Sequence, residues 1–426
     1  MSFALGVVPV VLLLCGFPIF VVLLSAISVA LVFFMNLPLA ALHQNMVAAI
    51  DAFALLAVPF FLYAGEVMGR GSVARRLMQV VQTGVSPVPG NIAVTTVGTC
   101  AIFGAISGAS SATVATIGQI VLPGLRKQRY PETFSAGLIT AVGAIDIIIP
   151  PSIPMIIYGA SAQESVPKLY AAGIGPGLLI AGLLILYVMF YARHRGIDTG
   201  EPFSARAFMK AMGAGVWALG APFIILGGIY GGVFSPTEAA AVACVYSMFV
   251  TLLVYRDIGW SGIYACAGTT VRVTAQIFII VACANVFSWL LTVNQVPTAI
   301  VAWLESMHFG QIGILAMINV LLLIVGCFVD PLSAIVMLTP LLVPIVKAAG
   351  IDTVHFGIIV TVNLAIGMFT PPFGLNIFVA QAVLKFPIAT ILRGLWPFLS
   401  LYLVALTLIT YIPSISLFGV RLFFQH

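Results

Sequence analysis

Two Pro-Pro pairs lie within apolar runs of this sequence, one in IIIPPSIPM (147–155) and one in MFTPPFGLN (368–376). A double proline removes two backbone donors and moves the preceding residue out of the α region, so a helix cannot continue through it. Backbone groups that are freed inside a membrane must be buried in protein or line a wet cavity. The two breaks therefore predict places where carbonyl oxygens coordinate a hard cation such as Na⁺ and N–H groups bind an anion.

Two further apolar stretches are interrupted halfway by small or polar residues, SGASSA at 107–112 and DPLSA at 330–334. We expect each of these tips to face one break, so that two quasi-symmetric ion sites flank the substrate. The first predicted site comprises Ser107, Gly108, Ser110, Gly143, Asp146, Pro150 and Ser152. The second predicted site comprises Gly326, Asp330, Ser333, Gly367, Thr370, Gly374 and Asn376.

Several of these residues also have structural explanations. Serines occur in membrane helices as small packing residues. Asp330 could cap a helix that begins at Pro331, could be functional as an intramembrane carboxylate, or could do both. Asp146 could coordinate an ion, take up a proton or pair with a polar neighbour. Glu66 is expected at a membrane interface or a helix contact.

The composition places these residues in a polytopic integral membrane protein. The chain has 426 residues, of which 62% are hydrophobic and 7% charged, and its mean hydropathy is +1.19. Soluble domains carry roughly 25% charged residues. The net charge of +5 is small and dispersed, which argues against nucleic acid as a partner. The histidines form no metal-like cluster and no catalytic motif is present, so we expect neither an enzyme nor a cofactor other than Na⁺ as coupling ion.

Nine apolar runs are long enough to cross a membrane, because about 20 apolar residues suffice. They lie near 5–34, 51–69, 133–162, 171–193, 207–230, 236–255, 270–292, 355–384 and 389–411. The first run is either one long tilted helix or two short helices around CGFP. Two segments with mixed polarity, 36–50 and 257–269, are expected to be interfacial helices.

The stretches 92–124 and 311–346 are predicted to be re-entrant hairpins, which enter the membrane and return to the same side. Basic clusters on both sides of the first hairpin place its ends in the cytoplasm. The flanks of the second hairpin are poor in basic residues and belong outside. The two hairpins are therefore expected to enter from opposite faces.

Both halves of the chain then have the same order: span, hairpin, broken span, span. We predict an all-α inverted repeat with two re-entrant hairpins and two broken transmembrane helices. Its halves are 1–194 and 236–412, with a linking span in 195–235 and a C-terminal tail at 413–426.

Five long motifs closely resemble the large membrane subunit of tripartite ATP-independent periplasmic (TRAP) transporters, of the DctM/SiaM type. They are DAFALLAVPFFLYAGEVMGRG (51–71), FGAISGASSATVATIG (103–118), IIIPPSIPMIIYG (147–159), GCFVDPLSAIVMLTPLLVPI (326–345) and HFGIIVTVNLAIGMFTPPFGLNIFVA (355–380). The likeness runs nearly end to end and the motifs occur in order, so the resemblance is specific.

The resemblance implies an elevator-type, Na⁺-driven carrier of the ion-transporter superfamily in the bacterial inner membrane. It implies two partners: a small four-helix membrane subunit, expected here as a separate chain, and a periplasmic substrate-binding protein that delivers an organic anion. Dicarboxylates, sialic acids, other sugar acids and sulfonates are the implied substrate classes.

The family places Na⁺ at the hairpin tips and helix breaks. In this sequence these positions are Ser107, Gly108, Ser110, Gly143, Asp146, Pro150, Gly326, Ser333, Gly367 and Thr370. The implied substrate contacts are Ser107, Ser152, Asp330, Gly374 and Asn376. The sequence departs from the family pattern at AIDIII, where many members have a small or hydroxyl residue with Gly-Pro and this chain has Asp146.

Three other functions compete with this interpretation. A stand-alone Na⁺- or H⁺-coupled anion carrier would share the inverted hairpins but would work without a binding protein. An ion channel would conduct without coupling, yet no predicted helix is lined regularly with polar residues. A membrane enzyme would need a catalytic cluster, which the sequence lacks.

Overall fold

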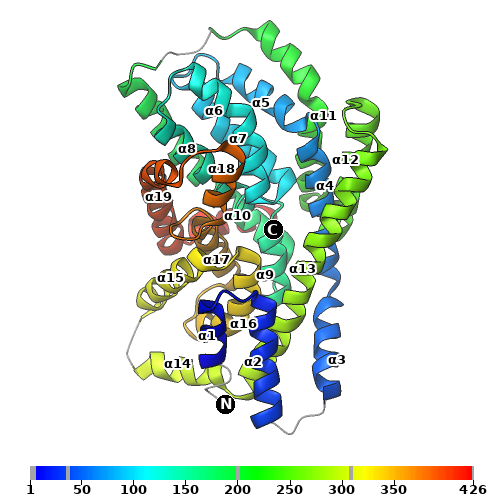
Figure 1. Ribbon diagram of the computed structural model, residues 1–426, viewed down its shortest axis with the longest axis vertical. Helices are drawn as coiled ribbons and strands as arrows, with labels where there is room; N and C mark the ends of the chain where they lie inside the picture. The colour runs from blue at the N-terminus through cyan, green and yellow to red at the C-terminus, as the bar shows by residue number, and fades with distance from the viewer. Residues whose placement is uncertain (1–5, 35–38, 198–201, 307–309, 425–426) are drawn as a thin grey trace.

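The computed structural model describes residues 6–34, 39–197, 202–306 and 310–424, and every regular element within them is a helix (Figure 1). Eight of these helices are long and apolar enough to cross a membrane. They are Phe53–Arg70, Val166–His194, Ala205–Tyr230, Pro236–Val254, Trp260–Val293, Gln311–Phe328, Pro331–Ala348 and Ile388–Tyr411. The prediction of an all-helical, multi-pass membrane protein is confirmed.

One group of helices, which we call the frame, lies mostly along the right-hand side of Figure 1, with α2 nearer the middle at the bottom. Within the frame, α13 packs against α2, α3 and α4, while α12 packs against α4 and α11. The frame consists of α2 (Ile19–Phe34), α3 (Leu39–Ile50), α4 (Ala57–Arg70), α11 (Ala205–Tyr230), α12 (Pro236–Phe249) and α13 (Trp260–Val293). A short 3₁₀ turn, η2 (Phe53–Leu56), precedes α4, and a π turn, η4 (Val250–Val254), extends α12.

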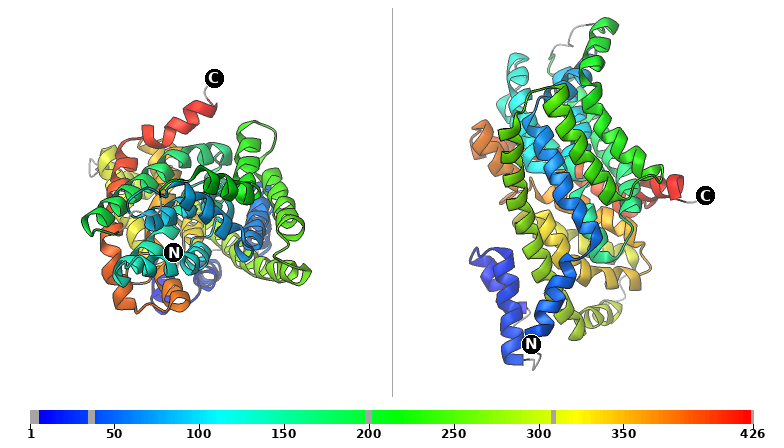
Figure 2. Two further views of the ribbon diagram at one scale, coloured as in Figure 1. Left: turned by 90° about the horizontal axis from the view of Figure 1, so that it is seen from above. Right: turned by 90° about the vertical axis from the view of Figure 1, so that its right-hand side faces the viewer.

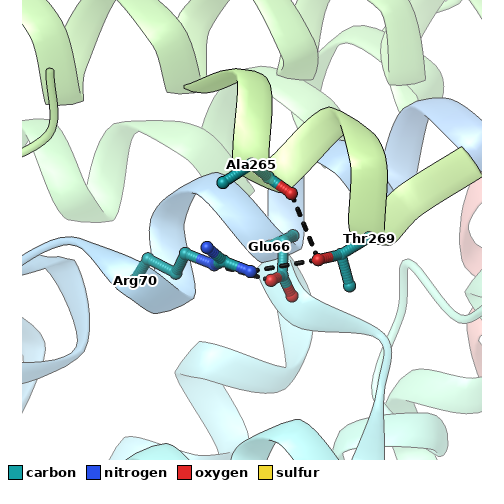
Figure 3. Close-up of polar contacts among 4 residues, drawn as sticks. All are labelled: Glu66, Arg70, Ala265 and Thr269. Carbon is teal, nitrogen blue, oxygen red and sulfur yellow. Dashed lines mark hydrogen bonds and ion pairs between the residues drawn. The ribbon is translucent and has the colours of Figure 1, made fainter. Parts of the chain in front are cut away.

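A polar contact ties two frame helices together (Figure 3). Arg70 of α4 donates to Glu66 one turn earlier at 2.8 Å and to the Thr269 hydroxyl of α13 at 3.0 Å. The Thr269 hydroxyl in turn donates to the Ala265 carbonyl of its own helix at 3.2 Å. Glu66 therefore lies at a helix contact, one of the two places expected for it.

Two helix pairs turn back on themselves at the predicted tips. The first pair is α6 (Asn91–Ser107) and α7 (Ser110–Lys127), in the upper half of Figure 1. The second pair is α15 (Gln311–Phe328) and α16 (Pro331–Ala348), in the lower half. Only residues 108–109 and 329–330 separate the members of the two pairs.

Both double prolines break a helix, as predicted. The first broken helix consists of α8 (Glu132–Val142), the 3₁₀ turn η3 (Gly143–Ile147) and α9 (Ile153–Ala162). The second consists of α17 (Thr353–Gly367) and α18 (Leu375–Leu384). Each later piece packs on the helix pair of the other half, because α9 contacts α16 and α18 contacts α7. Parts of the chain at least 169 residues apart (Ala162 of α9 to Pro331 of α16) therefore meet at each break.

Three further helices complete a bundle with the pairs and the broken helices. They are α10 (Val166–His194), α19 (Ile388–Tyr411) and α20 (Ser414–Phe424). α8 crosses α19 at Gly137 and Gly394, where a Cβ on either glycine would overlap the backbone of the other helix. α10 packs against α17 and α20, and the end of α20 projects from the side of the molecule (Figure 2).

The largest buried side chains belong to this bundle. Tyr158, Tyr170, Tyr402, Phe103, Phe356 and Phe369 are all less than 2% exposed. Their helices are α6, α9, α10, α17, α19 and the second break. The aromatic part of the core therefore lies where the two halves of the chain interlock, while aliphatic side chains of the frame, such as Leu23 and Met68, continue the same buried cluster.

The structure corrects several expected boundaries. Residues 257–269 do not form a separate interfacial helix, because α13 continues from Trp260 to Val293, and its Thr269 satisfies its hydroxyl within the helix. The first run is two helices, α1 (Val8–Leu14) and α2. Of the expected interfacial segment 36–50, α3 forms the described part, and residues 36–38 lie outside the described residues.

Three helices lie in segments for which we predicted none. They are α5 (Val73–Gly84), α14 (Val296–Ser306) and α20, which occupies the expected tail. Each has only 11 or 12 residues, too few for the membrane-span criterion on which the prediction relied.

Candidate functional site

The first tip is fastened to the first broken helix by a buried carboxylate. The Gly108 amide, at a left-handed φ of 61°, donates to Asp146 Oδ1 at 3.1 Å. The Thr113 hydroxyl donates to Asp146 Oδ2 at 2.5 Å. Asp146 is 0% exposed, and a Cβ on Gly104 would lie 2.7 Å from the Asp146 Cα. Both oxygens of Asp146 therefore serve to hold the turn between α6 and α7.

A side chain from the second break also contacts the first tip. Asn376 donates through Nδ2 to the Ser110 hydroxyl at 2.8 Å and to the Thr140 carbonyl at 3.3 Å. Gly143 lies beside it, since a Cβ there would be 3.4 Å from Asn376 Nδ2. We predicted that Asn376 would lie at the second tip, and its placement corrects that grouping. The cause is the packing of α18 against α7 and α8.

Asn376 leaves one oxygen available. Its Oδ1 is buried and accepts no hydrogen bond from the described part of the chain. A buried acceptor without a donor costs free energy, so buried polar atoms in native proteins usually have a hydrogen-bond partner. An acceptor that has none needs an explanation. The Oδ1 atom is therefore a buried oxygen beside Ser110 that has no donor among the described residues.

The second tip is held locally. Asp330 is the N-cap of α16 and accepts from the Ser333 amide at 3.0 Å and from the Ser333 hydroxyl at 2.5 Å. Pro331 takes the first helical position, as the capping interpretation predicts. Asp330 itself is exposed, whereas Ser333 is buried. Unlike Asp146, Asp330 is therefore open to a ligand.

Glycines bring the second pair against the second broken helix. A Cβ on Gly367 would overlap the carbonyl of Gly326, which belongs to α15. Within the break itself the chain is also tightly folded, because a Cβ on Gly374 would lie 2.8 Å from the Met368 carbonyl oxygen. At the breaks, hydroxyls satisfy nearby carbonyls. Ser152 donates to Ile147 at 2.6 Å and Thr370 donates to Ile366 at 2.7 Å.

Both tips and both breaks line one cavity of about 300 Å³. The frame closes its other side with α13 and Leu62 of α4. The polar lining side chains are Ser110, Ser111, Gln276, Asp330 and Ser333. Among the described residues that line the cavity, Asp330 is the one with an ionisable side chain. The volume is at the lower end of the range for small-molecule sites.

The cavity separates the predicted residues into two sets. Gly108, Ser110, Asp330 and Ser333 line it. The others form the wall behind it or the breaks themselves: Ser107, Gly143, Asp146, Pro150, Ser152, Gly326, Gly367, Thr370, Gly374 and Asn376. Ser107 lies against the frame, since a Cβ on Gly65 of α4 would be 2.7 Å from its carbonyl oxygen.

Gln276 is a polar cavity residue that was not among the predicted site residues. It lies in α13 and lines the cavity from the frame side. An amide inside the apolar run 270–292 was the signal that could have identified it.

The donor set does not suit a transition metal. In the part of the chain that the structure describes, no three His, Cys, Asp or Glu side chains form a group that could hold a metal ion. The available ligands are hydroxyl, amide and carbonyl oxygens at the tips and breaks, which suit a hard cation.

Comparison with known proteins gives the family. Residues 7–415 match the model of the tripartite ATP-independent periplasmic transporter, DctM component. The chain is 42% identical to the isethionate TRAP transporter permease protein DctMQ of Oleidesulfovibrio alaskensis, over 95% of this chain and 64% of that protein. It is 40% identical to the ectoine TRAP transporter large permease protein TeaC of Halomonas elongata, over 96% of both chains.

A solved structure shares the fold. The YdaH transporter of Alcanivorax borkumensis superposes with a TM-score of 0.64 at 15% identity, over 98% of this chain and 99% of that one. At this identity the likeness concerns the fold alone. The family match and the two relatives are decisive: this chain belongs to the DctM family, the large membrane permeases of TRAP transporters.

Proposed function

We propose that this chain is the permease of a Na⁺-coupled, binding-protein-dependent transporter that imports a small organic acid. The relatives are named for isethionate and ectoine, both small polar compounds with an acidic group. A cavity of about 300 Å³ fits a ligand of this size.

The observation that carries the proposal is the charge of the cavity. Both tips and both breaks line the cavity. Among its described lining residues, Asp330 is the one with an ionisable side chain. An anion beside a carboxylate in a largely apolar cavity is repelled unless a cation accompanies it. Coupling to Na⁺ supplies that cation.

Oxygen atoms at the tips support two positions for Na⁺. At the first tip these are the unpartnered Asn376 Oδ1 and the Ser110 hydroxyl. At the second tip the exposed carboxylate of Asp330 lines the same cavity as Met368 and Leu375 of the second break. Buried Asp146 contributes indirectly, by holding the first tip in shape.

The arrangement also supports an elevator mechanism. The tips and breaks belong to one interlocked bundle, and α13 of the frame closes the cavity. We infer that both helix pairs are re-entrant, that Na⁺ binding orders their tips, and that the loaded bundle then moves along the frame. We place the chain in the bacterial inner membrane, with a small membrane subunit and a periplasmic binding protein as partners.

Uptake into proteoliposomes tests the proposal. The vesicles would contain this chain with its small subunit, and the panel would include isethionate, ectoine, a C4-dicarboxylate and sialic acid. The binding protein and an inward Na⁺ gradient would each be present or absent. Uptake that requires both supports the proposal and names the substrate.

Two outcomes would contradict it. Uptake without the binding protein would instead indicate a stand-alone carrier. Uptake that is indifferent to Na⁺ would remove both tips as ion sites.

A further inference from the structure

A second hollow, of about 950 Å³, lies at the base of the α6–α7 pair, where α6 begins and α7 ends. This is the end of the pair opposite its tip. It is formed where this base meets the ends of α5 and α10. Its lining side chains are largely polar or basic, in contrast to the central cavity. We call it the basal pocket.

Three cations line the basal pocket: Lys127, Arg129 and Arg195. All three are exposed, and none forms an ion pair within the described part of the chain. The neighbouring Arg126 does not line the pocket and pairs with Glu132 at 3.2 Å. Among the described residues that line the pocket, none is acidic. Within the described residues, the positive charge of the pocket therefore has no acidic side chain beside it.

The pocket also contains the beginning of a long helix. Asn91 and Ile92, the first residues of the 17-residue α6, line it. The N-cap is Gly90, which has no side chain to accept from the first amides. Free N–H groups at a helix N-terminus and the helix dipole both favour an anion.

A side chain that lines the pocket also holds the start of α6. Gln128 lines the pocket and donates through Nε2 to Asn91 Oδ1 at 2.9 Å. Its Oε1 is buried and accepts no hydrogen bond from the described residues. The hydrogen bond from Gln128 to Asn91 fixes the start of α6 at the wall of the pocket.

We propose that the basal pocket binds a phosphate-bearing anion between Lys127, Arg129 and Arg195. Phosphate fits because it accepts several charge-assisted hydrogen bonds from arginine and lysine at once. The phosphate could belong to an anionic phospholipid or be free in solution. Basic pockets on the cytoplasmic side of membrane proteins bind lipid headgroups, and the basic clusters place this side in the cytoplasm.

The test uses two variants of the full chain with the same change in net charge. The pocket variant carries Lys127→Gln, Arg129→Gly and Arg195→Gln. Arg129 has a left-handed φ of 58°, which glycine adopts more readily, so this change should not disturb the fold. The control variant carries Arg193→Gln, Arg206→Gln and Lys210→Gln, which are exposed and do not line the pocket.

Native mass spectrometry would count the phosphatidylglycerol and phosphatidylcholine retained by each purified protein. We expect the wild type and the control to retain phosphatidylglycerol in preference to phosphatidylcholine. The pocket variant should retain at least roughly tenfold less phosphatidylglycerol than the wild type. In a second arm, inorganic phosphate would be titrated and the unfolding temperature followed. A shift in wild type and control but not in the pocket variant, without lipid retention, would support the site and identify a soluble source.

Equal retention of both lipids with no response to phosphate would overturn the proposal. Equal losses in the pocket and control variants would also overturn it, since they would indicate diffuse surface charge. If the triple pocket variant does not fold, Arg129→Gly alone must still weaken binding of phosphatidylglycerol or phosphate. Binding of both unchanged in that single variant would overturn the proposal as well.

Discussion

The two tips are built on the same plan, but each carries its carboxylate in a different place. In the first half the acid is Asp146, on the broken helix, and it is 0% exposed with both oxygens bound to the tip. In the second half the acid is Asp330, on the tip itself, and it is exposed to the cavity. The first carboxylate is committed to structure, whereas the second remains available to a ligand.

The positions before the two breaks make the difference clearer. Asp146 and Gly367 each precede a Pro-Pro pair by four residues. In both halves a glycine of the tip helix meets the backbone of the broken helix, Gly104 at Asp146 and Gly326 at Gly367. The first half adds a carboxylate that hydrogen-bonds to the tip. We infer that the hydrogen bonds of Asp146 reinforce the first tip, whereas the second tip relies chiefly on the backbone contact, so different substitutions should damage them most.

Asp146→Ala should have the largest effect on the fold. It leaves the Gly108 amide and the Thr113 hydroxyl without their acceptor in a buried site. Each unsatisfied buried group costs about 1–3 kcal/mol, so the free energy of unfolding should fall by roughly 2–6 kcal/mol. Thermal unfolding in detergent measures the loss, and uptake should disappear with it. The matched control is Asp330→Ala, which loses only a cap, worth about 0.5–2 kcal/mol. Equal destabilisation by the two would refute the contrast between the tips.

Gly367→Ala should be the next most severe change. The new Cβ would overlap the Gly326 carbonyl, which is backbone and cannot rotate away. Overpacking of this kind costs about 1–3 kcal/mol or more. Gly213→Ala is the control, because its Cβ would meet nothing within 4 Å in α11 and alanine favours a helix. Unfolding temperatures of both variants decide the matter, and an unchanged value for Gly367→Ala would exclude a close backbone contact at the second tip.

The sequence predicted the elements of the site better than their partners. Both breaks and both tips followed from local chemistry, because double prolines and an Asp-Pro cap act on their own segment. The partner of Asn376 did not follow, since its position depends on α18 packing against α7 from the other half. Local signals cannot report how two halves of a chain interlock.

The same limit explains the errors in the frame. The polar residues at 257–269 suggested an interfacial segment, but Thr269 satisfies its hydroxyl within α13 and accepts from Arg70 of α4. The short helices α5 and α14 lack the length that identifies a membrane span. Gln276 was overlooked because one amide in an apolar run acquires its meaning only when α13 is seen to line the cavity.

Asn376→Ala tests the first tip through a residue of the second half of the chain, because Asn376 donates to Ser110. The change removes the unpartnered Oδ1 and the hydrogen bond to Ser110. The Na⁺ concentration for half-maximal uptake should rise roughly tenfold, as expected for losing an interaction worth about 1.4 kcal/mol. Asn363→Ala is the control, since Asn363 Oδ1 is also buried and unpartnered among the described residues, but its amide donates to Asn319 and Ile359 rather than to a tip residue. A Na⁺ dependence shifted equally by both would rule out a specific ligand at Asn376.

Asp330→Asn should have the smallest effect on the fold while still altering transport. Asparagine caps a helix about as well as aspartate, so the free energy of unfolding should change by less than about 0.5 kcal/mol. The cavity loses its negative charge, and the half-saturating Na⁺ concentration should rise roughly fivefold, about 1 kcal/mol of charge interaction. Asp352→Asn is the matched control, because Asp352 caps α17 through the His355 amide at 2.8 Å and does not line the cavity. Na⁺ titrations of uptake would compare the two. An unchanged titration in Asp330→Asn would remove this carboxylate from the ion site and leave the second tip with a purely structural cap.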